Sequence, residues 1–246
     1  MKLDLSLLRR FHPGPLLDLV WPRACEICGR PAGEAARYFC WDCLSTLPII
    51  ELPHCSRCGD PVEGAITRDY VCSFCVDREP HFDLARSAIR FKGGVRDVLH
   101  RFKYSHATYL NRDLATLLHA CVRTHYSRKR FDAVTFVPLH PIKERSRTYN
   151  QARLLAGHLA KLMDVPLARG CLRRIRETGT QTHLNLRQRA RNVEGAFVAH
   201  YPEWIEGRSF LLVDDVMTTG ATVSEISRVL KDAGAADVCV VTVARG

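Results

Sequence analysis

Two spacings of apolar residues alternate along the chain from residue 82 onward. Short β-branched runs, typical of buried strands, lie at 84–91, 133–138, 209–215 and 237–244. Stretches with apolar residues three and four positions apart, typical of helices, lie at 94–103 and 110–126 and begin near 150 and 222. Strands that alternate with helices in this order predict an α/β domain with a mostly parallel sheet flanked by helices.

The first 80 residues lack this alternation and carry pairs of cysteines instead. Four CxxC pairs are present: Cys25 and Cys28, Cys40 and Cys43, Cys55 and Cys58, Cys72 and Cys75. A tight knuckle points both of its thiolates at one tetrahedral ion, and a second knuckle completes a set of four. The pattern predicts two structural Zn²⁺ sites, whose metal supplies folding free energy that so short a segment lacks.

Other interpretations of the cysteines stay open at this point. A single CxxC pair also suits a redox dithiol, and disulfides are disfavoured because no export signal precedes the pairs. We expect neighbouring pairs to share an ion, with interleaved pairing as the alternative. The three remaining cysteines lie in apolar surroundings and are predicted to be core residues: Cys121, Cys171 and Cys239.

Composition is that of a globular protein, with 246 residues of which 46% are apolar and 25% charged. No apolar stretch approaches the roughly 20 residues that span a bilayer. Asp4, Arg9, Arg10 and Asp18 interrupt the leucine-rich N-terminus, so it does not resemble a secretory signal. We expect a cytoplasmic protein without membrane insertion. Its expected parts are an N-terminal helix and double zinc-ribbon module over 1–80 and the α/β domain over 81–246.

Charge is distributed unevenly between these two parts. Residues 1–80 carry 9 Lys and Arg against 11 Asp and Glu, whereas the remainder carries 27 against 15. The basic excess of the second part indicates a polyanionic ligand, either a phosphorylated metabolite or a nucleic acid; a solvated basic face is the alternative. Thiolate-bound zinc makes the first part more acidic, which favours a protein-docking or spacer role for it.

The segment LLVDDVMTTGAT at 211–222 carries the most specific chemistry. An apolar strand ends in Asp214 and Asp215 and continues through a Thr and Gly loop into a helix, at the edge of a parallel sheet where ligands bind. Main-chain N–H groups of 217–221 and the threonine hydroxyls are placed to hold a phosphate at the positive end of the helix. The two carboxylates are placed to accept hydrogen bonds from the vicinal hydroxyls of an attached ribose.

This segment resembles the phosphoribosyl-pyrophosphate (PRPP) signature of type I phosphoribosyltransferases. The whole chain is similar to the ComF/GntX family, which combines cysteine knuckles with a phosphoribosyltransferase-like domain and is implicated in competence and DNA utilisation. The similarity includes the CxxC pairs, RFKYSHATYL from 101, VPLHPIKERSRTYNQA from 137 and TGTQTHLNLRQRARNVEGAF from 178. It implies a type I phosphoribosyltransferase-like fold preceded by a small zinc-ribbon domain with two four-cysteine sites.

The resemblance assigns roles to individual residues. PRPP binding, with Mg²⁺, falls to Lys143, Arg145, Arg147, Asp214, Asp215, Val216, Met217, Thr218, Thr219, Gly220, Ala221 and Thr222. The basic residues at 143–147 are expected in a loop that holds the pyrophosphate. The family usually reads R-G-F-N-Q where this chain has Thr148 in place of glycine, and threonine disfavours positive φ.

Residues 178–192 resemble the loop that closes over the site in phosphoribosyltransferases and excludes water. Asp214, Asp215, Arg189 and Arg191 are the candidate catalytic residues, and Lys103, Arg187, Arg189 and Arg191 are the candidate nucleic-acid contacts. A solvated helix face is the alternative for the arginines, although a spacing of two residues favours an extended segment. Lys103 and Tyr104 are expected to contact an anion or a base, or to be structural.

Two functions follow as expectations. The first is a PRPP-binding protein of DNA uptake or utilisation that transfers phosphoribosyl groups with the help of Mg²⁺. The second is a non-catalytic adaptor that binds single-stranded DNA and recruits a competence helicase or another DNA-uptake component through the zinc module. A basic cleft suits both ligands, because each presents phosphate groups.

Overall fold

The structure is a computed structural model that describes residues 23–32, 37–62, 64, 70–177 and 191–246. The chain divides into two compact units, residues 1–47 and residues 48–246. The second set of cysteine pairs therefore belongs to the larger unit. A division at residue 80, expected from the cysteine spacing, stays a prediction.

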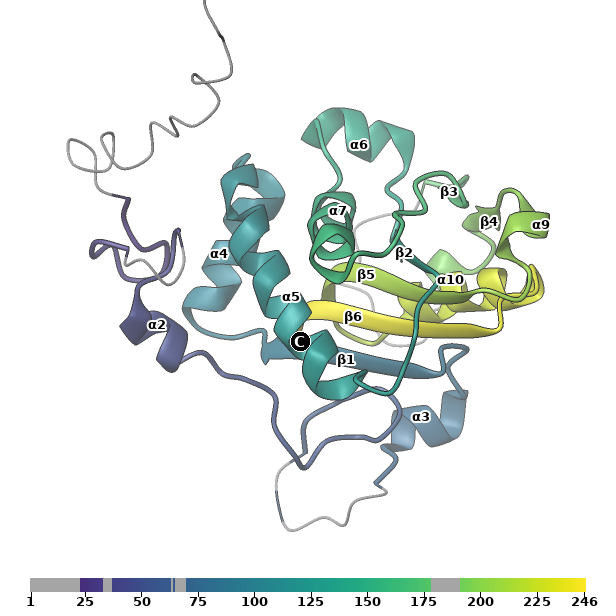
Figure 1. The fold of residues 1–246 in the computed structure, drawn as a ribbon, viewed down its shortest axis with the longest axis horizontal. Helices are drawn as coiled ribbons and strands as arrows, with labels where there is room; N and C mark the ends of the chain where they lie inside the picture. The colour runs from purple at the N-terminus through teal and green to yellow at the C-terminus, as the bar shows by residue number, and fades with distance from the viewer. Residues whose placement is uncertain (1–22, 33–36, 63, 65–69, 178–190) are drawn as a thin grey trace, which may run out of the picture. The chain divides into compact units, whose positions relative to one another are not determined.

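A parallel sheet of four strands forms the centre of the larger unit (Figure 1). Its order is β1 (Leu84–Arg90), β6 (Asp237–Arg245), β5 (Ser209–Met217) and β2 (Ala133–Phe136). All three neighbouring pairs are parallel. Strands β2, β5 and β6 are mostly buried, as expected for a sheet covered on both faces, whereas β1 alternates between buried and half-buried residues. This architecture confirms the predicted α/β fold.

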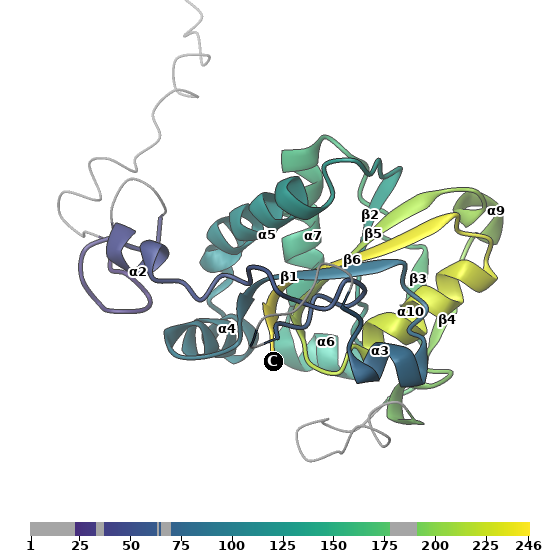
Figure 2. The ribbon, with the colours of Figure 1, turned by 90° about the horizontal axis from the view of Figure 1, so that it is seen from below.

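Helices cover both faces of this sheet. Figure 2 shows α5 (Asn111–His125) and α7 (Gln151–Met163) on one face and α10 (Ala221–Asp232) on the other. The predicted apolar face of α10 is buried at Val223, Ile226, Val229 and Leu230. Gly234 follows the helix with φ +87°, the left-handed conformation in which glycine ends helices.

Shorter elements complete the larger unit. They are α3 (Ser73–Arg78), α4 (Gly94–Tyr104), the 3-10 turn η2 (Thr108–Leu110), α6 (Pro141–Arg147) and α9 (Pro202–Ile205). A separate antiparallel pair joins β3 (Leu172–Arg174) to β4 (Phe197–Ala199). Cys121, Cys171 and Cys239 are buried in the core, as predicted. Within the described residues, every helix is too short or too polar to cross a bilayer.

The smaller unit is built around the first cysteine set. Its knuckle is closed by hydrogen bonds from the Cys25 amide to the Arg30 carbonyl (2.6 Å) and from the Gly29 amide to the Cys25 carbonyl (2.8 Å). A short helix, α2 (Trp41–Ser45), carries Cys43. Among the described residues of this unit, Ile27 packs against a cluster formed by the predicted metal ligands Cys25, Cys40 and Cys43.

The second cysteine set is hydrogen-bonded to the sheet itself. The Ala85 amide of β1 donates to the Arg57 carbonyl of the knuckle at 2.9 Å. Gly59 has φ +69°, and a Cβ there would lie 2.8 Å from the Ala85 carbonyl oxygen. Only glycine permits an approach this close. The knuckle formed by Cys55 and Cys58 therefore packs directly against β1.

The basic segment at 143–147 differs from the sequence expectation. It forms helix α6, begun by Pro141, rather than a loop. Proline at the first position of a helix has a φ already suited to it and an N–H that no helical bond needs. Helix α6 ends at Thr148, which adopts φ +65° although glycine is absent. A β-branched residue in this conformation is strained.

We predict that Thr148→Gly raises the free energy of unfolding by about 1 kcal/mol, because glycine adopts positive φ without a steric penalty. Urea unfolding followed by circular dichroism measures this change. Thr148→Ala is the matched control: it keeps the Cβ and loses the methyl group and the hydroxyl, which contacts His106 Nδ1 at 3.3 Å and donates to the Arg147 carbonyl at 2.6 Å. If Thr148→Gly were no more stable than Thr148→Ala, the inferred backbone strain at Thr148 would be refuted.

Candidate functional site

A cavity of about 390 Å³ lies where β5 ends and α10 begins. Its walls come from α4, α6, α7, β3 and the turn that joins β5 to α10. The lining residues are Phe91, Lys103, Tyr104, Val137, Leu139, Lys143, Arg147, Asn150, Gln151, Ala152, Arg174 and 214–223. The predicted signature thus surrounds one hollow at the carboxyl edge of the sheet, where ligands of α/β proteins bind.

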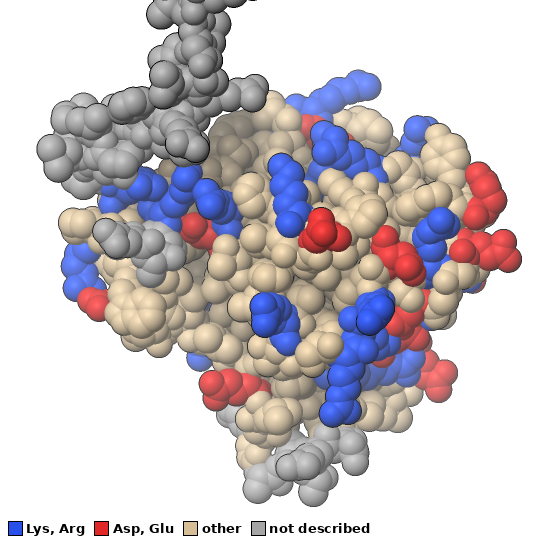
Figure 3. Space-filling view, in the orientation of Figure 1, with Lys and Arg blue, Asp and Glu red and all other residues tan. Residues whose placement is uncertain are grey.

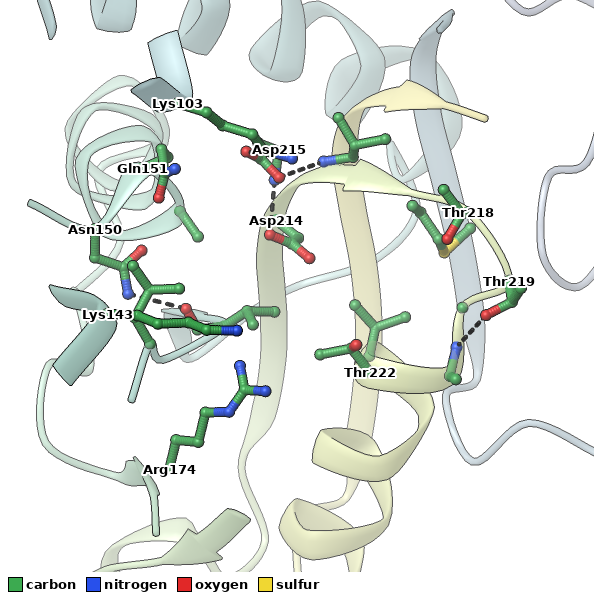
Figure 4. A pocket seen from close by; sticks show the side chains of 18 of the residues that line it. Lys103, Lys143, Asn150, Gln151, Arg174, Asp214, Asp215, Thr218, Thr219 and Thr222 are labelled. Atoms are coloured by element: carbon green, nitrogen blue, oxygen red, sulfur yellow. Dashed lines mark hydrogen bonds and ion pairs between the residues drawn. The ribbon is translucent and has the colours of Figure 1, made fainter. Parts of the chain in front are cut away.

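The acidic pair, Asp214 and Asp215, lines this cavity (Figure 4). The Asp214 carboxylate accepts a hydrogen bond from the Asp215 amide at 2.9 Å, and the Asp215 carboxylate accepts one from the Val216 amide at 2.7 Å. Asp215 also forms an ion pair with Lys103 of α4, with Nζ 3.1 Å from Oδ2. The carboxylates are therefore held by backbone and by a lysine before any ligand arrives.

Burial shapes the ionisation of this pair. Burial and the charge of Asp215 raise the pKa of Asp214 from 3.8 to about 8. Burial alone would lower the pKa of Lys103, but the charges of Asp215 and Asp214 outweigh burial and raise it. Lys103 therefore stays charged, while Asp214 accepts or releases a proton near neutral pH.

The turn after β5, predicted to hold a phosphate and called the cradle below, leads directly into α10. Gly220 has φ +74° and is the N-cap of the twelve-residue helix α10. The Thr219 hydroxyl accepts a long hydrogen bond, 3.4 Å, from the Ala221 amide. Thr222 lies in the first turn of α10 and lines the cavity. The positive end of the α10 dipole thus points at the hollow, as an anion site requires.

Cations form the wall opposite the threonines. Lys143 and Arg147 are four residues apart on α6, so they share one helix face and both line the cavity. Arg145 is exposed and does not line it. The Arg147 guanidinium lies 4.7 Å from the centre of the Tyr104 ring. Of the three basic residues predicted for pyrophosphate, the structure therefore brings two to the site.

Arg174 is a site residue that sequence reasoning missed. It ends β3, is 8% exposed, and projects toward the same space as Lys143 and Asp214 (Figure 4). Its guanidinium also lies 5.3 Å from the centre of the Phe197 ring. Burial lowers its pKa. Three arginines stand close together at 173–176, and no periodicity marks which of them faces inward.

Of the remaining predicted residues, the structure describes Arg191 and Lys103. Arg187 and Arg189 fall outside the described residues. Arg191 is exposed and lines a neighbouring cavity of about 730 Å³, together with Phe74, Arg78 and Arg228. Both cavities reach Ala221. The Lys103 ammonium forms an ion pair with Asp215 and lines the first cavity, and its contact with an anion or a base stays a prediction.

Each cysteine set brings its four sulfur atoms within 4.8 Å of one another. The sets are sequential, Cys25 to Cys43 and Cys55 to Cys75, so the predicted pairing is confirmed over the interleaved one. Burial raises the pKa of Cys58 to about 12. A dication is needed to hold such buried sulfurs as thiolates, and four thiolates in this arrangement suit Zn²⁺.

Two domain families match the chain. A double zinc ribbon domain matches residues 16–76 and a phosphoribosyl transferase domain matches residues 150–246. Together with the parallel sheet, these matches define a zinc-ribbon protein with a type I phosphoribosyltransferase-like domain.

Named relatives identify the family. "Competence protein F" of Haemophilus influenzae is 32% identical over 202 residues, 80% of this chain and 86% of the relative. "DNA utilization protein YhgH" of Salmonella typhimurium is 30% identical over 223 residues, 89% and 96% of the two chains. "Competence protein ComFC" of Bacillus subtilis is 28% identical over 201 residues, 80% and 79%. The chain belongs to the ComF/GntX family that its motifs resemble.

The raised pKa of Asp214 predicts a pH-dependent stability. Since this pKa is higher in the folded chain than in the unfolded one, the stabilising contribution of the neutral carboxyl is complete below pH 3.8 and is lost as pH rises toward about 8. Asp214→Asn, which stays neutral, should exceed the wild type in unfolding free energy at pH 8 by about 1 kcal/mol or more.

Denaturant unfolding at pH 5, 6, 7 and 8 provides the measurement. The unfolding free energy of Asp214→Asn should exceed that of the wild type by a margin that grows at each step in pH. Asp215→Asn is the contrast, because it removes the partner of Lys103 and should be less stable than the wild type throughout. Parallel pH profiles for the wild type and Asp214→Asn would contradict the account.

Proposed function

We propose that residues 81–246 bind PRPP together with Mg²⁺ in the cavity at the end of β5. The observation that carries this proposal is the acidic pair placed directly before a threonine-lined helix N-terminus. Asp214 and Asp215 accept hydrogen bonds from the ribose hydroxyls, and the cradle at 217–222 holds the 5′-phosphate.

The charges of the cavity support this orientation. PRPP carries a phosphate at one end and a pyrophosphate at the other. The helix N-terminus suits the first, and Lys143, Arg147 and Arg174 on the opposite wall suit the second. Burial, Arg174 and Arg147 all lower the pKa of Lys143, which indicates a concentration of positive charge that an anionic ligand relieves.

Mg²⁺ fits the donor set, because it prefers carboxylate and phosphate oxygens and is commonly bound by one or two carboxylates plus substrate phosphates. Asp214 and Asp215 are the carboxylates available in the cavity. When bound, Mg²⁺ neutralises charge on the pyrophosphate. The chain's own residues orient the ribose and hold both phosphate ends in place.

The reaction that this arrangement suits is phosphoribosyl transfer. A nucleobase-like nitrogen forms a bond to C1 of the ribose as the bond from C1 to the pyrophosphate oxygen breaks, and pyrophosphate leaves with the electron pair. Lys143, Arg147 and Arg174 stabilise the negative charge that develops on the leaving group. Arg189 and Arg191, the other predicted catalytic residues, join from the segment that is proposed to close over the site.

Calorimetric titration with PRPP and Mg²⁺ tests the proposal. The wild type should release or take up measurable heat on binding, and Asp214→Ala should weaken binding at least tenfold, about 1.4 kcal/mol. Arg145→Ala is the matched control, because Arg145 shares α6 with Lys143 and Arg147 but does not line the cavity. Absence of heat with the wild type, or equal affinity of Asp214→Ala, would remove the proposal.

The names of the relatives, which refer to competence and to DNA utilization, support a role for this activity in the uptake or utilisation of DNA. We propose a cytoplasmic protein that handles imported DNA or its nucleotides. In this setting the zinc-ribbon part serves as the docking module for a helicase or another component of DNA uptake. Exposed apolar side chains such as Trp41, which is 69% exposed, offer contact area for such a partner.

A second candidate function is a non-catalytic adaptor that binds single-stranded DNA. It is favoured by the basic excess of residues 81–246 and by the neighbouring cavity, in which Arg191 and Arg78 accompany the Phe74 ring. Arginine and aromatic side chains are the usual partners of single strands. On the face shown in Figure 3, basic side chains are dispersed among acidic ones, which predicts separate phosphate contacts rather than one continuous track.

The adaptor function predicts that affinity for an oligonucleotide falls steeply with salt and falls uniformly across sequences when Arg187, Arg189 and Arg191 are replaced by alanine. Fluorescence anisotropy at several salt concentrations measures both effects. Adding PRPP then separates the two functions: displacement of the oligonucleotide indicates a shared site, and its retention indicates the neighbouring cavity. Binding that is insensitive to salt would exclude the adaptor function.

A further inference from the structure

Arg245 is a buried arginine that joins the second cysteine set to the central sheet. It is the last residue of β6, and its side chain is 7% exposed. Its Nε donates to Asp60 Oδ1 at 2.8 Å, and its Nη2 donates to Cys58 Sγ at 3.8 Å. The side chain therefore reaches from the sheet to a predicted zinc ligand and to the residue two positions after it.

Zinc bound at the second cysteine set would explain why a charged arginine is buried at position 245. A buried guanidinium is unfavourable unless opposite charge compensates it. Asp60 is a partly exposed partner at 42%, and within the described residues Arg245 Nη1 is buried without a hydrogen-bond partner. Four thiolates and one Zn²⁺ carry a net charge of −2 beside this guanidinium. Hydrogen bonds to ligating atoms also orient metal ligands and tune their affinity.

The backbone of the same residue supports the phosphate cradle. Arg245 is opposite Met217 in the pairing of β6 with β5. The Gly246 amide donates to the Met217 carbonyl at 3.0 Å, and the Phe91 amide donates to the Arg245 carbonyl at 2.6 Å. Met217 and Phe91 both line the cavity. A shift at Arg245 therefore moves the point at which β5 becomes the cradle.

Two packing contacts lie along the same route. A Cβ added to Gly246 would lie 3.4 Å from the Thr218 methyl group, so the chain after Arg245 packs against the first cradle threonine. A Cβ added to Gly220 would lie 3.7 Å from the Phe82 ring. Phe82 is 1% exposed and lies seven positions after Cys75, the last residue of the second cysteine set. The cradle thus packs against Phe82, which is close in sequence to the second cysteine set.

We propose that Arg245 is a positioning residue that couples Zn²⁺ at the second cysteine set to the order of the cradle at 217–222. Zinc at Cys55, Cys58, Cys72 and Cys75 holds the Arg245 side chain, and Arg245 holds the end of β5. Insofar as the cradle binds PRPP, which rests on the proposed function, zinc and PRPP stabilise each other's binding, because coupling between two sites is reciprocal.

The test uses the full zinc-loaded chain as wild type and as Arg245→Met. Zinc release to a coloured chelator is followed together with amide hydrogen exchange of the peptide that covers 216–222. Arg245→Met should weaken zinc binding at the second set roughly 10- to 100-fold, leave the first set unchanged, and speed exchange at 216–222. A Cys28→Ser chain, which lacks the complete first set, identifies the release phase that belongs to the second.

Two further variants keep the test decisive. Lys129→Met is the matched control, because it removes an ion pair to Asp237 at the opposite end of the same strand and should change neither readout. Arg245→Lys keeps the charge and loses the guanidinium fork, so it should give intermediate values and serves if Arg245→Met fails to fold. Zinc release and exchange equal to the wild type, or exchange raised equally in β1 and β2, would overturn the proposal.

Adding PRPP separates this inference from the proposed function. PRPP should slow zinc release from the second set in the wild type and have no effect on it in Arg245→Met. If Arg245 were only structural, Arg245→Met would change the rate of zinc release, but PRPP would still slow that release. This result would overturn the proposed coupling. If the wild type binds no PRPP, the proposed function fails, and zinc release and exchange at 216–222 still decide whether Arg245 couples the metal to the cradle.

Discussion

Two adjacent carboxylates at a desolvated strand end are the constraint around which this site is built. Like charges this close resist joint ionisation, so each needs a compensating group. Asp215 is paired with Lys103, and Asp214 meets the demand by a raised pKa of about 8. The arrangement is unfavourable for stability alone, and such unfavourable arrangements gather at functional sites. A ligand that brings hydroxyl groups and a cation supplies what the acidic pair lacks.

The rest of the larger unit presents other groups to the same hollow. β5 delivers the carboxylates, α10 directs its N-terminus at the cradle, and α6 with β3 contributes Lys143, Arg147 and Arg174. The second cysteine set belongs to this unit and is hydrogen-bonded to β1. The second predicted metal site and the candidate ligand site therefore lie in one compact unit, which distinguishes the second cysteine set from the first.

Local signals in the sequence were sufficient for the core of the fold and the centre of the site. The four strands of the central sheet and helices α4, α5, α7 and α10 follow apolar spacing. The sequential cysteine sets were the expected arrangement, although the spacing of the knuckles left the interleaved pairing open. The signature at 211–222 is continuous in the chain, so its turn was predictable from neighbouring residues. Each of these features depends on contacts between residues close in sequence.

Features that depend on distant segments were not predictable. The approach of Lys103 to Asp215 joins residues more than 100 positions apart, and Arg174 and Arg245 face inward for reasons that their neighbours do not reveal. Helix α6 was expected as a loop because its basic residues were interpreted by function rather than by Pro141, which favours a helix start. Thr148 adopts the positive φ that its side chain disfavours, since the surrounding fold outweighs the local preference.

A crystal structure of the chain with PRPP and Mg²⁺ bound tests the central claim most directly. The account predicts density for the 5′-phosphate within hydrogen-bond distance of the backbone amides between Thr218 and Thr222, with the ribose hydroxyls on Asp214 and Asp215. Density for the ligand elsewhere on the molecule, or a cavity that stays empty at saturating PRPP, would contradict it.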